Sequence, residues 1–155
     1  MAECEFCRLS TEDKKWRIYE NAYWTVLLAD RQDYPGRCIV ICNKHRESLG
    51  ALNLEEWISL KAVMTSLERM VKNELGAEMF NWTCLMNNAY KTEPAVPHVH
   101  FHFRPRYQKT VSIDGQSFTD QEFGHHYDNN RPLQLDTETV EFIHKKLMES
   151  IDKYF

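Results

Sequence analysis

The stretch from His98 to Phe103 reads His-Val-His-Phe-His-Phe, so histidine and apolar residues alternate strictly. Successive side chains of a β-strand point to opposite faces, and this order therefore predicts a strand over residues 98–104. The three imidazoles would share one face, with roughly 6.6–7 Å between successive positions, while the apolar side chains face a core. Any fold of this chain must contain a sheet with one apolar face and one histidine-bearing face.

Patterns elsewhere in the chain predict further strands and two helices. The strands include a hairpin and a buried central strand, and they are expected at residues 16–20, 23–29, 37–42 and 80–86. A long helix is expected on one face of the sheet from about Leu54 to Leu75, because Asn53 is a good N-cap and Gly76 a good C-terminal stop. A last helix is expected from about Asp136 to Tyr154. Parallel strands would need a helix at each crossover, so we expect an α+β fold with an antiparallel sheet of about five strands.

Length and charge limit the classes of partner. The chain has 155 residues, enough for one domain, and its 19 Lys and Arg against 23 Asp and Glu give a formal net charge of −4. That balance argues against nucleic acid as a partner and requires any phosphate recognition to be local. No apolar run approaches the ~18 residues of a membrane span, the first residues are acidic where a signal peptide would be basic, and the five cysteines are an odd number. We therefore expect a cytoplasmic protein with no membrane partner.

Three imidazoles within five positions favour a functional site over a structural one. Neutral imidazoles are costly to bury without partners, and imidazolium groups repel one another. Two chemistries could use such a row: imidazoles could hold a transition metal, or one imidazole could attack phosphorus and carry a nucleotidyl group covalently. The spacing alone leaves both open.

The row resembles the histidine triad (HIT) motif of nucleotide hydrolases and transferases, here HVHFHFR followed by Pro105-Arg106-Tyr107. The resemblance extends upstream, where Tyr19-Glu20-Asn21 and residues 24–28 are similar to the family's opening hairpin and residues 35–41 to its Pro-Gly-His-apolar strand. It covers about residues 4 to 107.

The resemblance implies a domain organisation and an activity. We expect a HIT domain core over residues 1–107, an extension over residues 108–155 packed on the same domain, and the homodimer usual in the family. The implied activity is hydrolysis at the α-phosphate of dinucleoside polyphosphates or related nucleotide conjugates, through a covalent nucleotidyl-histidine intermediate.

Each triad histidine has a role implied by the resemblance. His100 matches the nucleophile that attacks the α-phosphate, and His102 matches the third triad residue, which contacts phosphate oxygens. The transferase branch has Gln at the third position, so His102 favours hydrolysis. His98, the first triad residue, completes the catalytic set.

Candidate substrate-binding residues also follow from matched positions. Asn87 would donate its amide to a phosphate or leaving group, Asp30 would accept from ribose hydroxyls, and Arg106 follows the triad strand. Two positions depart from the family pattern. Arg37 stands where many members have a fourth histidine, and Ala95 where many have Ser or Thr. Because a guanidinium is permanently charged and can hold an anionic phosphate, Arg37 favours a polyphosphate substrate.

A Cys-x-x-Cys pair at Cys4 and Cys7 is a weak metal signal by itself. Some bacterial-type members of the resembling family bind structural zinc through such a pair, the histidine of a Lys-His pair, and the first triad histidine. Here those further positions are His45 and His98. Because structural zinc takes four nitrogen or sulfur ligands, the resemblance implies one structural zinc ion per chain.

Two other functions remain open at this point. The histidine row could hold a catalytic metal in a metal-dependent hydrolase or dioxygenase, although no Asp or Glu beside it completes the ligand set. Alternatively, the chain could bind nucleotides without turning them over, as the departures at Arg37 and Ala95 suggest, although an intact His100 argues for retained chemistry. The run Gly124-His125-His126-Tyr127 could be a second metal site or a lid, and the sequence does not decide between them.

Overall fold

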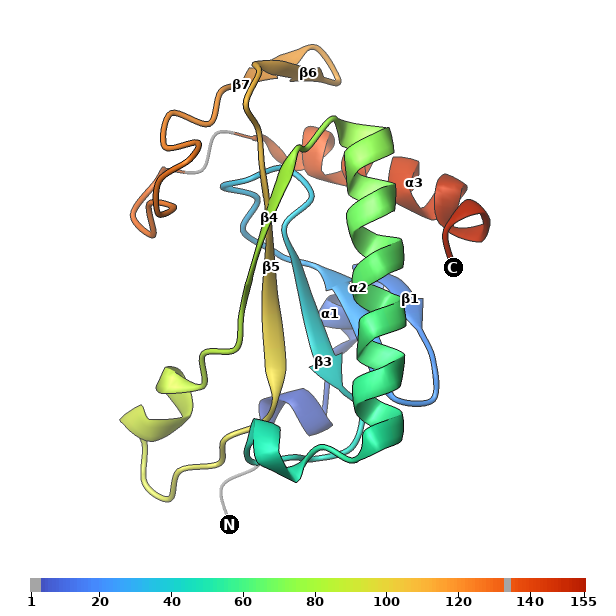
Figure 1. Cartoon of the computed structure of the whole chain (residues 1–155). Helices are drawn as coiled ribbons and strands as arrows, with labels where there is room; N and C mark the ends of the chain where they lie inside the picture. The colour runs from blue at the N-terminus through green and yellow to red at the C-terminus, as the bar shows by residue number, and fades with distance from the viewer. Residues whose placement is uncertain (1–3, 133–134) are drawn as a thin grey trace.

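A five-stranded antiparallel sheet forms the centre of the chain in the computed structural model, which describes residues 4–132 and 135–155 (Figure 1). Its strand order is β1-β2-β3-β5-β4. The strands are β1 (Arg17–Glu20), β2 (Trp24–Leu28), β3 (Cys38–Cys42), β4 (Met79–Thr83) and β5 (His100–Arg106). The predicted α+β class, antiparallel sheet and central strand are confirmed.

The two predicted helices are present. The long helix α2 (Leu54–Leu75) begins at Asn53, whose side chain accepts from the Glu56 N–H at 2.8 Å while the Glu56 carboxylate accepts from the Asn53 N–H at 2.8 Å. It ends at Gly76, whose φ of 84° is left-handed, as is common after a helix C-terminus. The last helix, α3 (Thr137–Ser150), is followed by the short 3-10 helix η4 (Ile151–Lys153), so its α-helical part ends earlier than expected.

Smaller elements flank the sheet. These are η1 (Glu5–Cys7), α1 (Thr11–Lys15), η2 (Leu49–Ala51), η3 (Asn87–Lys91) and a separate hairpin of β6 (Val111–Ile113) and β7 (Gln116–Phe118). The hairpin is not predicted by the sequence pattern, because its strands are three residues long and partly polar. None of the helices in the described part of the chain combines the length and apolar character that a membrane span requires.

The main core lies between the sheet and α2, which covers one face of it (Figure 1). The apolar stripe of α2 includes Leu60, Leu67 and Val71, all buried, and the same core contains Phe101 and Phe103 of β5. The apolar half of the alternating stretch therefore faces the core, as predicted. The histidine half lies on the opposite face of the sheet.

A close approach of helix and sheet fixes the start of β3. Gly36 has a φ of 80°, and a Cβ there would lie 2.7 Å from Cδ1 of Leu75 and 3.2 Å from Cγ1 of Val71. Only glycine accommodates both the left-handed backbone and this contact. Gly36 thereby places the next residue, Arg37, at the entrance to β3 beside β5.

Strand β5 begins at His100 and extends to Arg106, two residues later at each end than the predicted range. The segment before it remains extended, because the Cys42 N–H donates to the Val99 carbonyl at 3.1 Å. His98 therefore lies just before the strand.

Candidate functional site

A cavity of about 500 Å³ lies over the histidine face of the sheet. The N-terminal segment, the loop after β2, the start of β3 and the η3 loop surround it, and all three histidines of the row line it. The structure therefore brings His98, His100 and His102 together at one pocket.

Hydrogen bonds determine the tautomer of His100. Its Nδ1 lies 2.8 Å from the carbonyl oxygen of His98, and a carbonyl can only accept. Nδ1 must therefore carry the proton, which leaves the lone pair on Nε2. His100 is 8 % exposed, and burial lowers its pKa, which favours the neutral ring. A neutral imidazole with a free Nε2 lone pair is a nucleophile.

His102 is the neighbouring ring on the same face, with its centroid 5.0 Å from that of His100. Burial lowers the pKa of His102 to about 4, helped by the charges of His100, Arg37 and Arg104. Its buried Nδ1 has no hydrogen-bond partner among residues 4–132 and 135–155. His102 is therefore neutral near pH 7, and its ring lines the pocket.

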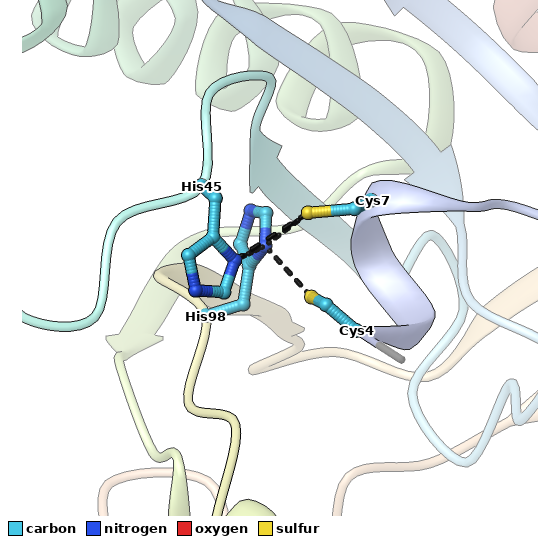
Figure 2. Close-up of side chains that lie close together, drawn as sticks. All are labelled: Cys4, Cys7, His45 and His98. Atoms are coloured by element: carbon cyan, nitrogen blue, oxygen red, sulfur yellow. Dashed lines mark hydrogen bonds between the residues drawn. The ribbon is translucent and has the colours of Figure 1, made fainter. Parts of the chain in front are cut away.

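The side chain of His98 is directed toward Cys4, Cys7 and His45, and these four residues are named here the metal cluster (Figure 2). Nε2 of His98 lies 2.7 Å from the carbonyl oxygen of Cys42, so Nε2 carries the proton and Nδ1 the lone pair. Nδ1 lies 3.1 Å from Sγ of Cys4 and 3.2 Å from Nδ1 of His45. The lone pair of His98 is thus directed into the cluster.

The dimensions of the metal cluster fit zinc. Cys7 Sγ lies 3.4 Å from Nδ1 of His45 and 3.5 Å from Nδ1 of His98, and the four ligand atoms lie within 4.8 Å of one another. A tetrahedron with zinc–ligand bonds of about 2.0–2.3 Å has edges of roughly 3.3–3.8 Å. The separations of His98 Nδ1 from the other three ligand atoms, and of Cys7 Sγ from His45 Nδ1, are therefore close to those that tetrahedral coordination requires.

The segment that carries the two cysteines also reaches the nucleophile. Phe6, between Cys4 and Cys7, packs on His100 with ring centroids 4.3 Å apart, and it lines the pocket. The sequence pattern does not identify Phe6 as a site residue, because its contact depends on how the metal cluster folds the chain back. The metal cluster thus positions one wall of the pocket.

Only some of the candidate substrate-binding residues line the pocket. Asp30 and Arg37 line the pocket, and Arg37 Nη1 donates to Asp33 Oδ1 at 3.0 Å. Both Asn87 and Asn88 are exposed, and of the two only Asn88 is among the residues that line the pocket, so Asn88 is the candidate amide donor of the η3 loop. Ala95 is half-buried and brings no hydroxyl group.

Arg106 does not reach the pocket, which corrects the prediction that it binds substrate. Its side chain is fully buried, and it donates from Nε to Asp120 at 2.7 Å and from Nη1 to Asn81 at 3.0 Å. It also donates to the carbonyl oxygens of Glu122 and His125 at 2.6 and 2.9 Å. These bonds occupy the guanidinium, so Arg106 joins β5 to the C-terminal segment.

The run from Gly124 to Tyr127 belongs to that same segment. Within the described residues, the groups that could hold a metal ion do not include His125 or His126. The His126 Nδ1 lies 2.8 Å from the Tyr127 carbonyl, and the Tyr127 ring packs on the Arg104 guanidinium at 4.0 Å. This run therefore covers the end of β5 rather than forming a second metal site.

Comparisons with known proteins agree with this architecture. The HIT domain model matches residues 10–109. The fold is similar to that of a hypothetical histidine triad nucleotide-binding protein from Sulfolobus tokodaii, with 20% sequence identity, a TM-score of 0.70, and coverage of 97% of this chain and 93% of that chain. A search of the curated proteins finds no match.

Two further solved structures share the fold. A Zn-bound histidine triad family protein from Mycobacterium smegmatis has 19% identity and a TM-score of 0.52, with 88% of this chain and 86% of that chain covered. A diadenosine triphosphate hydrolase from Plasmodium falciparum has 17% identity and a TM-score of 0.61, with 92% and 80% covered. At these identities the likeness concerns the fold alone.

Proposed function

Because the chain belongs to the HIT domain family, we propose that it is a hydrolase that releases mononucleotides from dinucleoside polyphosphates or related nucleotide conjugates. The observation that carries this proposal is the hydrogen bond from Nδ1 of His100 to the His98 carbonyl. It leaves the Nε2 lone pair of a buried, neutral imidazole at a pocket of nucleotide size.

In the first step, Nε2 of His100 attacks the α-phosphorus. A P–N bond forms, the bond from phosphorus to the leaving oxygen breaks, and the leaving group takes the electron pair. A polyphosphate is a good leaving group without a strong acid, which suits the absence of a hydroxyl at Ala95. In the second step, water adds to phosphorus and releases a proton to solvent, the P–N bond breaks, and its electron pair returns to Nε2 of His100.

Charge on the nonbridging oxygens is compensated by groups beside His100. His102, neutral near pH 7, offers one ring N–H to such an oxygen, and Arg37 supplies a fixed positive charge. Asn88 is the amide donor of the η3 loop, and Asp30 remains the candidate acceptor for ribose hydroxyls. These residues position and stabilise the reacting group.

One zinc ion would be held by the metal cluster. A site closed by four protein ligands leaves no coordination position for substrate, so the ion supplies folding free energy rather than a reacting group. Its residues join the N-terminal segment and the loop after β3 to the segment that precedes β5. In this way the cluster holds Phe6 against His100. A homodimer, with residues 1–107 as the HIT core and 108–155 as an extension, is part of the same proposal.

The proposal is tested by incubating the protein with a panel of dinucleoside polyphosphates and nucleoside phosphoramidates. Released mononucleotide is quantified by chromatography for the wild type and for His100→Ala. We expect release from at least one polyphosphate by the wild type and none by the variant. Binding of the panel without any release would instead indicate a nucleotide-binding protein without turnover.

A further inference from the structure

Two arginines face each other at the end of the histidine row opposite to the metal cluster. The register of β3 and β5 pairs Ile39 with His102. Continued by two residues, this register places Arg37 opposite Arg104, on the face that carries His102. Like charges directly opposite each other on neighbouring strands are destabilising. This arginine pair, Arg37 and Arg104, therefore requires a negative partner.

Arg104 is buried, and no carboxylate among residues 4–132 and 135–155 forms an ion pair with it. It is 6 % exposed, and its Nε has no hydrogen-bond acceptor among the residues that the structure describes. Its guanidinium packs on the face of Tyr127 at 4.0 Å. Arg106, two residues further along the same strand, is paired with Asp120 and hydrogen-bonded from all three nitrogens. A buried guanidinium is normally paired as in Arg106, so Arg104 is the exception.

The nearby carboxylates do not balance the positive charge. Asp33 accepts from Arg37 at 3.0 Å and lies 3.5 Å from Nε of Arg31, so two arginines already share it. Asp30 is exposed at the pocket. Three guanidinium groups thus face two carboxylates, only one of them buried. The charges of Arg37 and Arg104 also both lower the pKa of His102, which agrees with their position beside it.

We propose that Arg37 and Arg104 form an anion subsite next to His102 that binds a phosphate group beyond the one attacked by His100. This inference rests on the proposed function and specifies its substrate class: nucleotide conjugates with at least two linked phosphates. Guanidinium groups bind phosphate oxygens through two parallel N–H donors and keep their charge at any physiological pH. Tyr127 holds the plane of Arg104, so the C-terminal segment contributes to substrate choice.

The competing role for Arg104 is structural, as an anchor for Tyr127. The two roles predict opposite effects of Arg104→Met on stability. Removing a buried cation that faces another cation relieves repulsion, and Met keeps the length of the side chain. A ligand-binding role therefore predicts a melting temperature at or above that of the wild type, whereas an anchoring role predicts a lower one.

The direct test is binding of inorganic tripolyphosphate, measured by isothermal titration calorimetry. We expect the wild type to bind it and Arg104→Met to bind at least tenfold more weakly. The matched control is Arg69→Met, which removes an exposed arginine on α2 and should change the affinity less than twofold. No binding by the wild type, or equal binding by wild type and Arg104→Met, would overturn the subsite.

A second variant covers the case in which Arg104→Met does not fold. Arg104→Lys keeps the charge but loses the planar pair of donors, and it should weaken tripolyphosphate binding several-fold. Unchanged binding by Arg104→Lys would then overturn the subsite.

The binding measurement separates this inference from the proposed function, because it requires no hydrolysis. Tripolyphosphate binding that depends on Arg104, with no turnover of any nucleotide, would refute the hydrolase and leave the subsite. Turnover of dinucleoside triphosphate and phosphoramidate at a ratio unaffected by Arg104→Met would refute the subsite and leave the hydrolase. If the hydrolase and the subsite are both correct, the ratio of kcat/KM for dinucleoside triphosphate to kcat/KM for phosphoramidate should fall at least tenfold in Arg104→Met.

Discussion

The two ends of the histidine row suit ligands of opposite charge. At the end near the N-terminal segment, lone pairs and sulfur atoms of the metal cluster converge, and a cation satisfies them. At the other end, the arginine pair leaves positive charge that its neighbours do not balance, and an anion satisfies it. His100 and His102 lie between these ends. Converging acceptor atoms at one end of a strand thus favour a cation, whereas unbalanced donor groups at the other end favour an anion.

The same difference between the two ends indicates which groups would bind phosphate. Two cysteine thiolates would cancel the charge of a bound Zn²⁺, so a filled metal cluster adds little positive charge to the pocket. Compensation for the phosphate must therefore come from the arginine pair and from N–H donors. In this proposal, one end of the row would stabilise the fold and the other would select the substrate.

The largest expected effect on stability comes from breaking the metal cluster. Protein purified without added metal should contain about one zinc per chain, and Cys7→Ser should lose it and be destabilised by more than about 3 kcal/mol, because metal binding contributes to folding free energy. Folded Cys7→Ser should keep some hydrolysis. Metal analysis and thermal melting check this, with Cys84→Ser, a cysteine outside the cluster, as the control.

Two results would contradict this account of the metal. Metal-free wild-type protein that melts at the same temperature as zinc-loaded protein would remove the structural role. Complete loss of activity on mild chelation, restored by manganese or iron, would instead support a catalytic metal on the histidine row.

A smaller loss of stability is expected when the pH is lowered, through His102 at the other end of the row. The pKa of His102 is lowered to about 4 by burial and by the neighbouring charges, against about 6.5 in the unfolded chain. Above pH 6.5 both states are neutral and no penalty arises. As the pH falls from 6.5 toward 4, the unfolded chain binds a proton that the folded state does not. Stability is lost over that window, by at most about 3 kcal/mol.

Urea unfolding at pH 7.5 and pH 4.5 measures this loss. His102→Gln removes the titrating group, so its stability should fall less than that of the wild type between the two pH values. Because the other histidines are common to both proteins, the difference between the two curves isolates His102. Parallel curves would show that His102 is not held neutral by its surroundings.

The smallest expected effect concerns specificity. Arg37→His replaces a permanent charge with a largely neutral ring, so preference should move from polyphosphates toward phosphoramidates. The ratio of kcat/KM values should change about tenfold, which corresponds to about 1.4 kcal/mol. Steady-state kinetics on both substrates check this. An equal decrease for both would make Arg37 a general electrostatic residue, and the argument for a polyphosphate substrate would fail at that position.

Much of the fold is predictable because its signals are local. The bounds of α2 follow from Asn53, Gly76 and the apolar spacing between them, and these features act within a few residues. The alternation from His98 predicts which side chains face the core. The observed bounds of β5 lie two residues later than predicted, because the strand begins where its pairing with β3 begins, and that point depends on both strands.

The candidate site is predictable only where it does not depend on the C-terminal segment. The four ligands of the metal cluster are identified from matched positions, and the structure gathers them. Arg106 could not be assigned correctly from sequence, because alternation places it on the histidine face but Asp120 buries it there. Nothing in the local pattern distinguishes Arg104 from a solvated strand end, because the Tyr127 ring that packs on it lies far along the chain. These two outcomes depend on contacts between distant parts of the chain.

The central claim is that Nε2 of His100 attacks phosphorus, and trapping the intermediate tests it most directly. The reaction with a dinucleoside triphosphate is stopped in alkaline denaturant, because P–N bonds are labile in acid, and intact-protein mass spectrometry follows. We expect a mass increase of one nucleotidyl group, mapped by peptide analysis to His100 and absent from His100→Ala, whose turnover should fall by several powers of ten while ground-state binding stays within tenfold. Turnover by His100→Ala above about one per cent of the wild type, or nucleotide release without an adduct on His100, would contradict the account.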